Sequence, residues 1–425
     1  MSIKKVFLCA FGILMLTAMT ESCSKNDGED NYYELSGEPD GEGKAYSDEA
    51  GVTGGGGEGG SQGGNTQAGI VTAGEWCDLQ NWQFWSGLML GEEYSPKSDY
   101  WKFYTNNRIA LHVTDQSSKA VAGVPVKLMR ETEDGQTVLW ETVTDNHGWA
   151  ECWVGLYQKE TANANTLSVY IDGERMEQRP LICPWDSLKD EFCQTMDPIA
   201  RRPINEYIIT PRTSVKTSAD IAFVVDATGS MGDEINFLKS DLVDIIGKAA
   251  AVRPSTTMRT AALFYRDKED EYLTRHSDFT EDLSATAEFV NNQQADGGGD
   301  YPEAVHTALE RMLQNLSWDQ LARTRLAFLI LDAPAHYETD VINSLHQSVQ
   351  TCARMGIRLI PVAASGVDKN TEFMLRFFAI ATGGTYVLIT NDSGVGLDHI
   401  AATVGDYKVE QLNNLIIRLI DFYTE

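Results

Sequence analysis

Two hydrophobic patterns divide the chain. Between residues 108 and 182, apolar residues alternate with polar ones, and turn residues such as Gly123 and Gly148 separate the runs. A period of two places one face of each strand in a core and the other in solvent. We therefore predict a small antiparallel β-sandwich over residues 106–200. The predicted inward positions are Ile109, Leu111, Val113, Val124, Val126, Leu128, Ala150, Cys152, Val154, Leu167, Val169 and Ile171.

The pattern changes after a proline-containing connector at residues 202–211. Runs that are apolar on both faces now alternate with apolar stripes at helical spacing, such as Ile342, Leu345, Val349 and Cys352. Such runs are typical of parallel strands covered by helices on both faces. We predict a doubly wound α/β domain over residues 216–425, which makes the protein multidomain; ligands of such sheets bind beyond the carboxyl ends of the strands. The predicted strands are 221–225, 260–264, 326–331, 357–362 and 386–389.

Candidate metal ligands follow the first of these strands. In the run IAFVVDATGSMG, the strand ends at Asp226, and Thr228 and Ser230 lie in the turn after it. Mg²⁺ prefers octahedral oxygen coordination from carboxylates, hydroxyls and water. The turn can supply one side of such a shell, or it can be a strand-to-helix turn with a local cap.

This run resembles the metal-ion-dependent adhesion motif of the von Willebrand factor A family, which has the form D-x-S-x-S. The resemblance covers residues 219–425 and implies a bound Mg²⁺, or Mn²⁺ or Ca²⁺ in its place. The family supplies an aspartate after a later strand, matched by Asp332 after LAFLIL. It also supplies a threonine from a glycine-rich segment, where Asp300 of DGGGDYPEAV stands here. Asp300 has an alternative role as the cap of a helix that begins at Pro302.

The N-terminal segment has the layout of an export signal. Lys4 and Lys5 precede an apolar run that is shorter than a membrane span, and we predict a signal over residues 1–22 with Cys23 as the first residue after it. Ser22 before Cys23 resembles the end of a lipoprotein lipobox, although Thr20 and Glu21 depart from it. We expect lipidation of Cys23, for example by palmitate, and attachment to the outer membrane or cell surface; an ordinary signal peptide is the alternative.

Two segments separate this signal from the predicted sandwich. Residues 23–69 are polar, acidic and glycine-rich, which predicts a flexible linker. Residues 70–105 are rich in aromatic rings, which we expect to pack on the following domain; a surface that stacks on carbohydrate or peptide is the alternative. The runs VTDQSSKAVAGVPVKL and TVTDNHGWAECWV resemble Ig-like, carboxypeptidase-regulatory-type modules, which implies a spacer or interaction role for the sandwich.

Charge and cysteine spacing exclude several classes of function. The net charge of −28 repels phosphate backbones, so we predict no nucleic-acid partner. The chain has seven cysteines but no C-x-x-C pair, which argues against structural zinc. Cys183 and Cys193 can form a disulfide across a short loop, but their spacing alone leaves this open.

The predicted function is binding without catalysis. The family resemblance implies that the metal accepts an acidic residue of a protein ligand, and that the helix at residues 409–423 responds to this binding. Three aspartates at one site would weaken the pull of the ion on an acidic group. The main alternative is an envelope assembly or scaffold factor that docks another subunit. A metal-assisted hydrolase with His336 as the base is a third hypothesis, although no G-x-S-x-G or H-E-x-x-H motif supports it.

Overall fold

The computed structural model describes residues 69–183, 204–233, 235–299, 301–393 and 400–425. The predicted signal and linker, the proposed lipidation site Cys23, the disulfide partner Cys193 and the candidate ligand Asp300 lie outside these residues. Within them, no helix combines the length and the apolar character that crossing a membrane requires.

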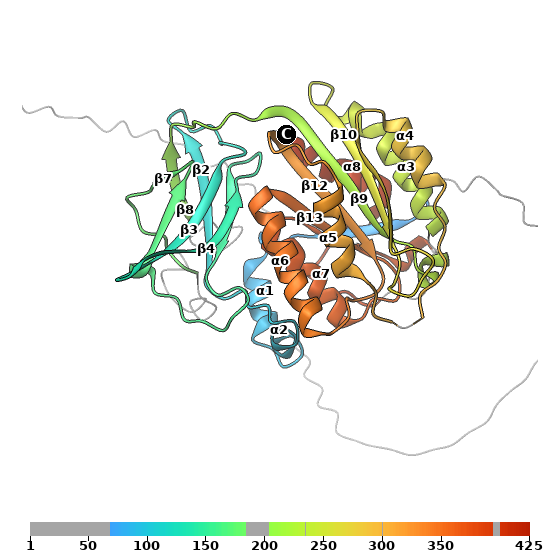
Figure 1. The fold of residues 1–425 in the computed structure, drawn as a ribbon, viewed down its shortest axis with the longest axis horizontal. Coiled ribbons are helices and arrows are strands. Elements are labelled where there is room, and N and C mark those ends of the chain that lie inside the picture. Colours follow the sequence, from blue (N-terminus) through green and yellow to red (C-terminus); the bar gives the residue numbers. More distant parts are fainter. Residues whose placement is uncertain (1–68, 184–203, 234, 300, 394–399) are drawn as a thin grey trace, which may run out of the picture. The chain divides into compact units, whose positions relative to one another are not determined.

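An eight-stranded mixed sheet forms the α/β unit, in the order β11-β10-β9-β12-β13-β14-β1-β15 (Figure 1). Its five parallel strands match the five predicted apolar runs: β9 (Lys216–Asp226), β10 (Thr257–Tyr265), β12 (Ala322–Leu331), β13 (Ile357–Ala363) and β14 (Tyr386–Ile389). Three strands run antiparallel to their neighbours and were not predicted: β1 (Thr72–Trp76), β11 (Thr274–Thr280) and β15 (Glu410–Gln411).

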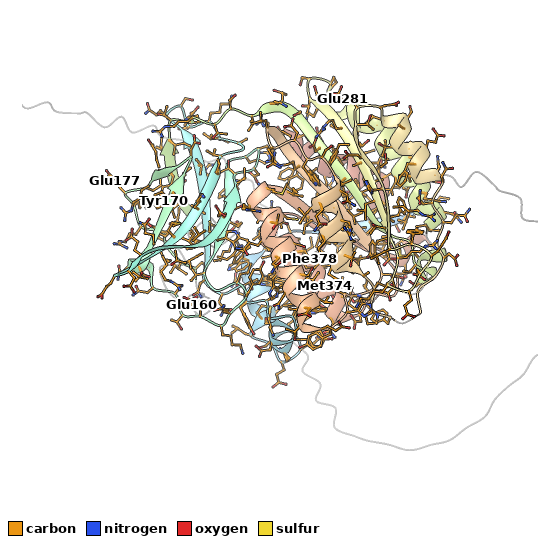
Figure 2. The ribbon with its side chains drawn as sticks, viewed as in Figure 1. Glu160, Tyr170, Glu177, Glu281, Met374 and Phe378 are labelled. Atoms are coloured by element: carbon orange, nitrogen blue, oxygen red, sulfur yellow. The ribbon has the colours of Figure 1, made fainter. Side chains whose placement is uncertain are left out.

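Helices cover both faces of this sheet, as the doubly wound prediction requires. One face carries α3 (Ile235–Val252), α4 (Leu283–Asn291) and α8 (Leu412–Thr424). The other carries α5 (Val305–Asn315), α6 (Thr339–Met355) and α7 (Lys369–Thr382). Met374 and Phe378 of α7 are fully buried, whereas Glu177 and Glu281 are exposed (Figure 2). Gly356 adopts the left-handed conformation that ends α6.

Two smaller sheets, with orders β5-β2-β8 and β4-β3-β6-β7, form the second unit. All the inward positions predicted from the alternation are buried. The strands are β2 (Arg108–Asp115), β3 (Pro125–Thr132), β4 (Gly135–Val143), β5 (Trp149–Trp153), β6 (Leu167–Ile171), β7 (Glu174–Arg175) and β8 (Ile204–Ile209).

Strand β8 corrects two predictions. We placed residues 204–209 in a connector, but they pair with β2, and they do so in parallel. The unit therefore extends beyond residue 200 and is not purely antiparallel. Tyr207 and Ile209 are buried while Glu206 and Ile208 are exposed, so the strand alternates correctly. The prolines on either side of this short run hid the pattern.

The aromatic-rich segment joins both units instead of packing on the sandwich alone. Its helices α1 (Trp82–Met89) and α2 (Ser95–Trp101) follow β1, which lies in the large sheet. Trp82 packs against Trp153 of β5 with ring centroids 5.9 Å apart. Trp85 stacks on Phe373 of α7 at 5.7 Å. The tryptophans of the segment are buried, which favours packing over a ligand-stacking surface.

Candidate metal centre

The run after β9 folds into a compact turn of oxygen atoms. Asp226 is the last residue of β9, and Ser230 lies in the 3₁₀ turn Gly229–Asp233. The backbone N–H and the hydroxyl of Thr228 donate to Asp226 Oδ1 at 2.9 and 2.7 Å. The hydroxyl oxygens of Thr228 and Ser230 are 3.2 Å apart. Asp226 and Thr228 are buried, and Ser230 is exposed, so the turn opens toward solvent at Ser230.

The second carboxylate oxygen of Asp226 has an unusual environment. Oδ2 is buried and accepts no hydrogen bond of standard geometry from the described residues. Burial, followed by the charge of Asp332, raises the pKa of Asp226 to about 7, against the opposing hydrogen bonds from Thr228 and from the hydroxyl of Tyr265. A buried carboxylate beside another carboxylate is stabilised by protonation or by a cation. This oxygen therefore suits a cation ligand.

Asp332 lies at the same edge of the sheet. It follows β12, which is parallel to β9 with Ile330 opposite Val225. The carboxyl ends of the two strands therefore meet, and Asp332 is close enough to raise the pKa of Asp226. The structure brings together four of the five candidate ligands, Asp226, Thr228, Ser230 and Asp332. Metal binding by them stays a prediction.

Glu303 is an acidic residue of this site that the sequence analysis missed. Its side chain is 3% exposed, and burial and then the charge of Asp226 raise its pKa to about 9. A Cβ placed on Gly298 would lie 3.3 Å from Glu303 Oε1 and 3.4 Å from the Cβ of Thr228. Glu303 thus lies across the glycine loop from the turn, and its raised pKa favours the protonated form when no cation is bound.

The prediction that a helix begins at Pro302, with Asp300 as its cap, is wrong about where the helix begins. Helix α5 begins at Val305 with Ala304 before it, so no helix begins at Pro302. The backbone at Glu303 is instead extended and lies alongside the loop that comes after β12, where the Glu303 N–H donates to Pro334 O at 2.8 Å. This extended path is what buries the Glu303 side chain beside Asp332 rather than exposing it on a first helical turn.

The glycine-rich loop is fixed on two sides. The Gly229 N–H donates to Gly297 O at 3.0 Å, which joins the loop to the Asp226 turn. The Gly298 N–H donates to both carboxylate oxygens of Asp270, at 3.0 and 2.9 Å. Gly297 and Gly298 have φ of +79° and +75°, which favours glycine. The backbone of the loop is therefore held against the candidate site by hydrogen bonds to Gly229 and to the carboxylate of Asp270.

His336, the base of the hydrolase hypothesis, is part-buried beside another carboxylate. Its Nε2 lies 3.0 Å from Oδ1 of Asp267. The contact with Asp267 gives His336 a structural role beside the candidate site.

A cavity of about 510 Å³ opens over the turn and the loop. Its lining residues are Gly229, Ser230, Gly297, Gly298, Gly299, Tyr301, Glu303, Asp332, Ala333, Ser365 and Gly366. In the described part of the chain, no three histidine, cysteine, aspartate or glutamate side chains converge to hold an ion. A cation here would therefore depend on the hydroxyls of Thr228 and Ser230 and on water, a donor set that fits Mg²⁺.

A family model described as the von Willebrand factor A domain matches residues 220–360. This part of the chain is a von Willebrand factor A domain. The match includes the Asp226 turn and Asp332, so the resemblance in the DATGSM run is confirmed at the level of the domain.

The relatives of the domain belong to larger and different proteins. A putative ariadne-like RING finger protein of Acanthamoeba polyphaga mimivirus is 29% identical over 132 residues, which is 31% of this chain and 13% of that protein. The alpha-protein kinase vwkA of Dictyostelium discoideum is 30% identical over 136 residues, 31% of this chain and 21% of the kinase. The chain thus spans about a fifth or less of these relatives.

Among solved structures, the conserved hypothetical protein BatB from Bacteroides thetaiotaomicron is similar to 48% of this chain. The similarity covers 98% of the BatB chain, with a TM-score of 0.33 and 11% identity.

Proposed function

We propose that the von Willebrand factor A domain binds a partner protein through a divalent cation held at the carboxyl ends of β9 and β12. Domains of this family commonly mediate protein interaction. The observation that carries the proposal is the buried Oδ2 of Asp226, which has no hydrogen bond of standard geometry, in a turn that also holds the hydroxyls of Thr228 and Ser230.

In this proposal each residue has a defined role. Asp226 and Asp332 supply negative charge, and Thr228 and Ser230 supply hydroxyl oxygens. Asp300, which lies outside the described residues, is the fifth candidate ligand. Mg²⁺ suits this oxygen set best, with Mn²⁺ or Ca²⁺ as substitutes. An acidic side chain of the partner takes an open position on the ion, and no catalytic step is involved.

The proposal includes the location of the protein. Lipidation of Cys23 would anchor the chain at the outer membrane or cell surface, and residues 23–69 would act as a tether for the two units. The Ig-like resemblance of the sandwich suggests a spacer that presents the metal face to partners.

An assembly or scaffold role that needs no metal is the second candidate. It is favoured by the fact that no three acidic, imidazole or thiol groups of the described residues converge on one point. Burial raises the pKa of both Asp226 and Glu303, so protons could then neutralise these carboxylates in place of an ion.

The two candidates differ in their response to EDTA and to Asp226→Asn. We would immobilise the wild-type chain and capture envelope proteins in Mg²⁺ or in EDTA, with Asp134→Asn in an exposed turn as the matched control. Partners that bind wild type and the control in Mg²⁺, but not the Asp226→Asn variant or EDTA-treated protein, support the metal face. Identical capture in all four samples would refute it.

A further inference from the structure

Three arginines gather at the opposite end of the sheet from the metal centre. Arg323 and Arg325 lie in the first half of β12, and Arg358 is the second residue of the neighbouring strand β13. Arg325 and Arg358 are 4% and 6% exposed. Burial, and then the charge of Arg358, lowers the pKa of Arg325 to about 10, so these guanidinium groups are close to each other.

No carboxylate of the described residues forms an ion pair with any of the three. Arg358 donates to the carbonyls of Thr382 and Val143 at 3.2 and 3.1 Å. Arg325 donates to the carbonyl of Ala322 at 2.7 Å. Arg323 Nε and Arg325 Nε are buried without a hydrogen bond. Buried cations are costly unless an anion compensates them, and this chain has a net charge of −28. The charges of Asp220 and Asp319 act on Arg325, but these carboxylates pair with Arg259 and Lys216, so none of the described carboxylates lies within ion-pair distance of the cluster.

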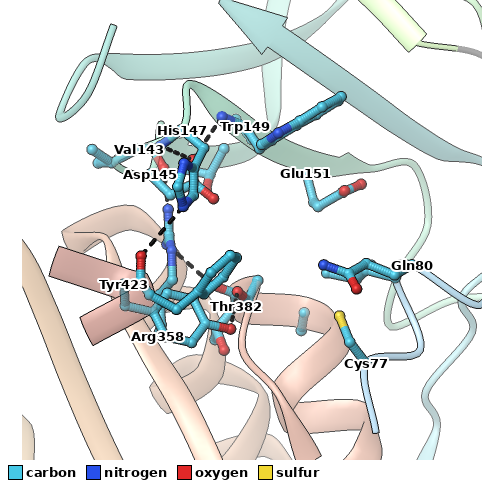
Figure 3. Close-up of a pocket in the computed structure, with 16 residues that line it drawn as sticks. Cys77, Gln80, Val143, Asp145, His147, Trp149, Glu151, Arg358, Thr382 and Tyr423 are labelled. Carbon is cyan, nitrogen blue, oxygen red and sulfur yellow. Dashed lines mark hydrogen bonds between the residues drawn. The ribbon is translucent and has the colours of Figure 1, made fainter. Parts of the chain in front are cut away.

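A pocket of about 320 Å³ opens at Arg358 (Figure 3). Its walls come from the sandwich, from the segment after β1 and from the ends of α7 and α8. Val143, Ala381 and Phe422 supply apolar surface, while Thr382 and Tyr423 supply hydroxyls. A concave site at the boundary of two units, mainly apolar with a few polar groups, is typical of a small-molecule site.

Two carboxylates line the pocket, and a cation pairs with Glu151 but not with Asp145. Glu151 accepts two hydrogen bonds from the buried Arg108, at 2.7 and 2.6 Å. Asp145 Oδ1 accepts the backbone N–H groups of His147 and Trp149 at 2.9 and 2.8 Å. Asp145 therefore keeps its charge, but three guanidinium groups, those of Arg323, Arg325 and Arg358, lie near it, so the Arg358 end of the pocket is positive.

We propose that this pocket binds a small organic anion. Its carboxylate is bound by the guanidinium of Arg358, because a planar fork of N–H donors matches two carboxylate oxygens. Its apolar body packs against Phe422, Val143 and Ala381. Because the ligand touches both units, its binding stabilises their packing. The site is separate from the metal face and does not depend on the function proposed there.

Benzoate is a suitable probe, because it combines one carboxylate with a flat apolar body. We would titrate the full chain with benzoate by calorimetry at constant ionic strength, with benzamide and inorganic phosphate in parallel. Saturable binding of benzoate is expected, with no binding of benzamide and weaker binding of phosphate. Arg358→Gln should weaken benzoate about tenfold or more, since it removes a charge-assisted contact. Arg311→Gln, at an exposed position of α5, should change nothing.

A second variant covers the case in which Arg358→Gln does not fold. Gln80 is an exposed residue of the pocket lining, so Gln80→Trp fills the pocket while leaving the arginines in place. It should abolish benzoate binding and leave the urea midpoint unchanged. The proposal is overturned if wild type shows no saturable benzoate binding, or if benzoate binds Gln80→Trp as tightly as wild type. Phosphate binding equal to that of benzoate also overturns it, since it indicates general anion adsorption.

Discussion

Asp78→Asn tests whether the segment before the sandwich is part of the α/β core. Asp78 follows β1, and its carboxylate accepts Nε and Nη2 of Arg376 in α7 at 2.9 and 2.6 Å. Both side chains are at most 1% exposed. The substitution leaves the buried guanidinium with Glu372 at 3.4 Å as its remaining carboxylate among the described residues.

Breaking a buried pair on one side costs about 3–5 kcal/mol. Asparagine keeps one acceptor oxygen and Glu372 keeps some charge compensation, so we expect about 3 kcal/mol, the lower end of that range. Urea unfolding followed by circular dichroism and tryptophan fluorescence measures this loss.

The control is Glu141→Gln, which breaks the pair with Lys127 at 2.7 Å. Those side chains are 27% and 50% exposed, so the expected loss is at most about 1 kcal/mol. If Asp78→Asn loses no more free energy than this control, the buried pair does not join the segment to α7 in the way we describe.

Two further predictions concern pH and the core. In EDTA the folded-state pKa values of Asp226 and Glu303 lie above those of the unfolded chain, so the free energy of unfolding should fall as pH rises from about 4 to 9. Asp226→Asn should flatten this fall in urea titrations, and an unchanged slope would contradict the assigned cause. Gly384→Ala would place a Cβ 1.8 Å from Leu359 O, which is backbone, so we expect a loss of several kcal/mol. A melting temperature within a degree or so of wild type would show that the backbone relaxes there.

The parallel core of the fold was predictable because its strands are apolar on both faces. The DATGSM run and Asp332 were predictable for the related reason that parallel strands end at one edge. Strand β1 was hidden because the run TAGEW has only two apolar residues, Ala73 and Trp76, at a spacing that shows no alternation. Its pairing with β14, for example Ala73 with Ile389, leaves no local signal. Strand β8 was hidden by flanking prolines. Short strands of this kind depend on pairing partners that lie far away along the chain, and a local pattern does not contain them.

The acidic site was only partly predictable. Glu303 stood within the quoted DGGGDYPEAV run, but a glutamate after proline suggests an exposed first helical turn. Only the extended path of the chain to Val305, bonded to Pro334, turns that side chain inward. The arginine cluster had no sequence signal, since Arg325 and Arg358 become neighbours through strand register alone.

The most direct test of the metal centre is a Mn²⁺ titration followed by electron paramagnetic resonance. Wild-type protein and Asp134→Asn should each bind one tightly held Mn²⁺ that excess Mg²⁺ displaces, and Asp226→Asn should lose this ion while keeping its circular dichroism spectrum. If folded Asp226→Asn protein holds Mn²⁺ as tightly as wild type, or if wild type holds none, no cation is bound where β9 and β12 end.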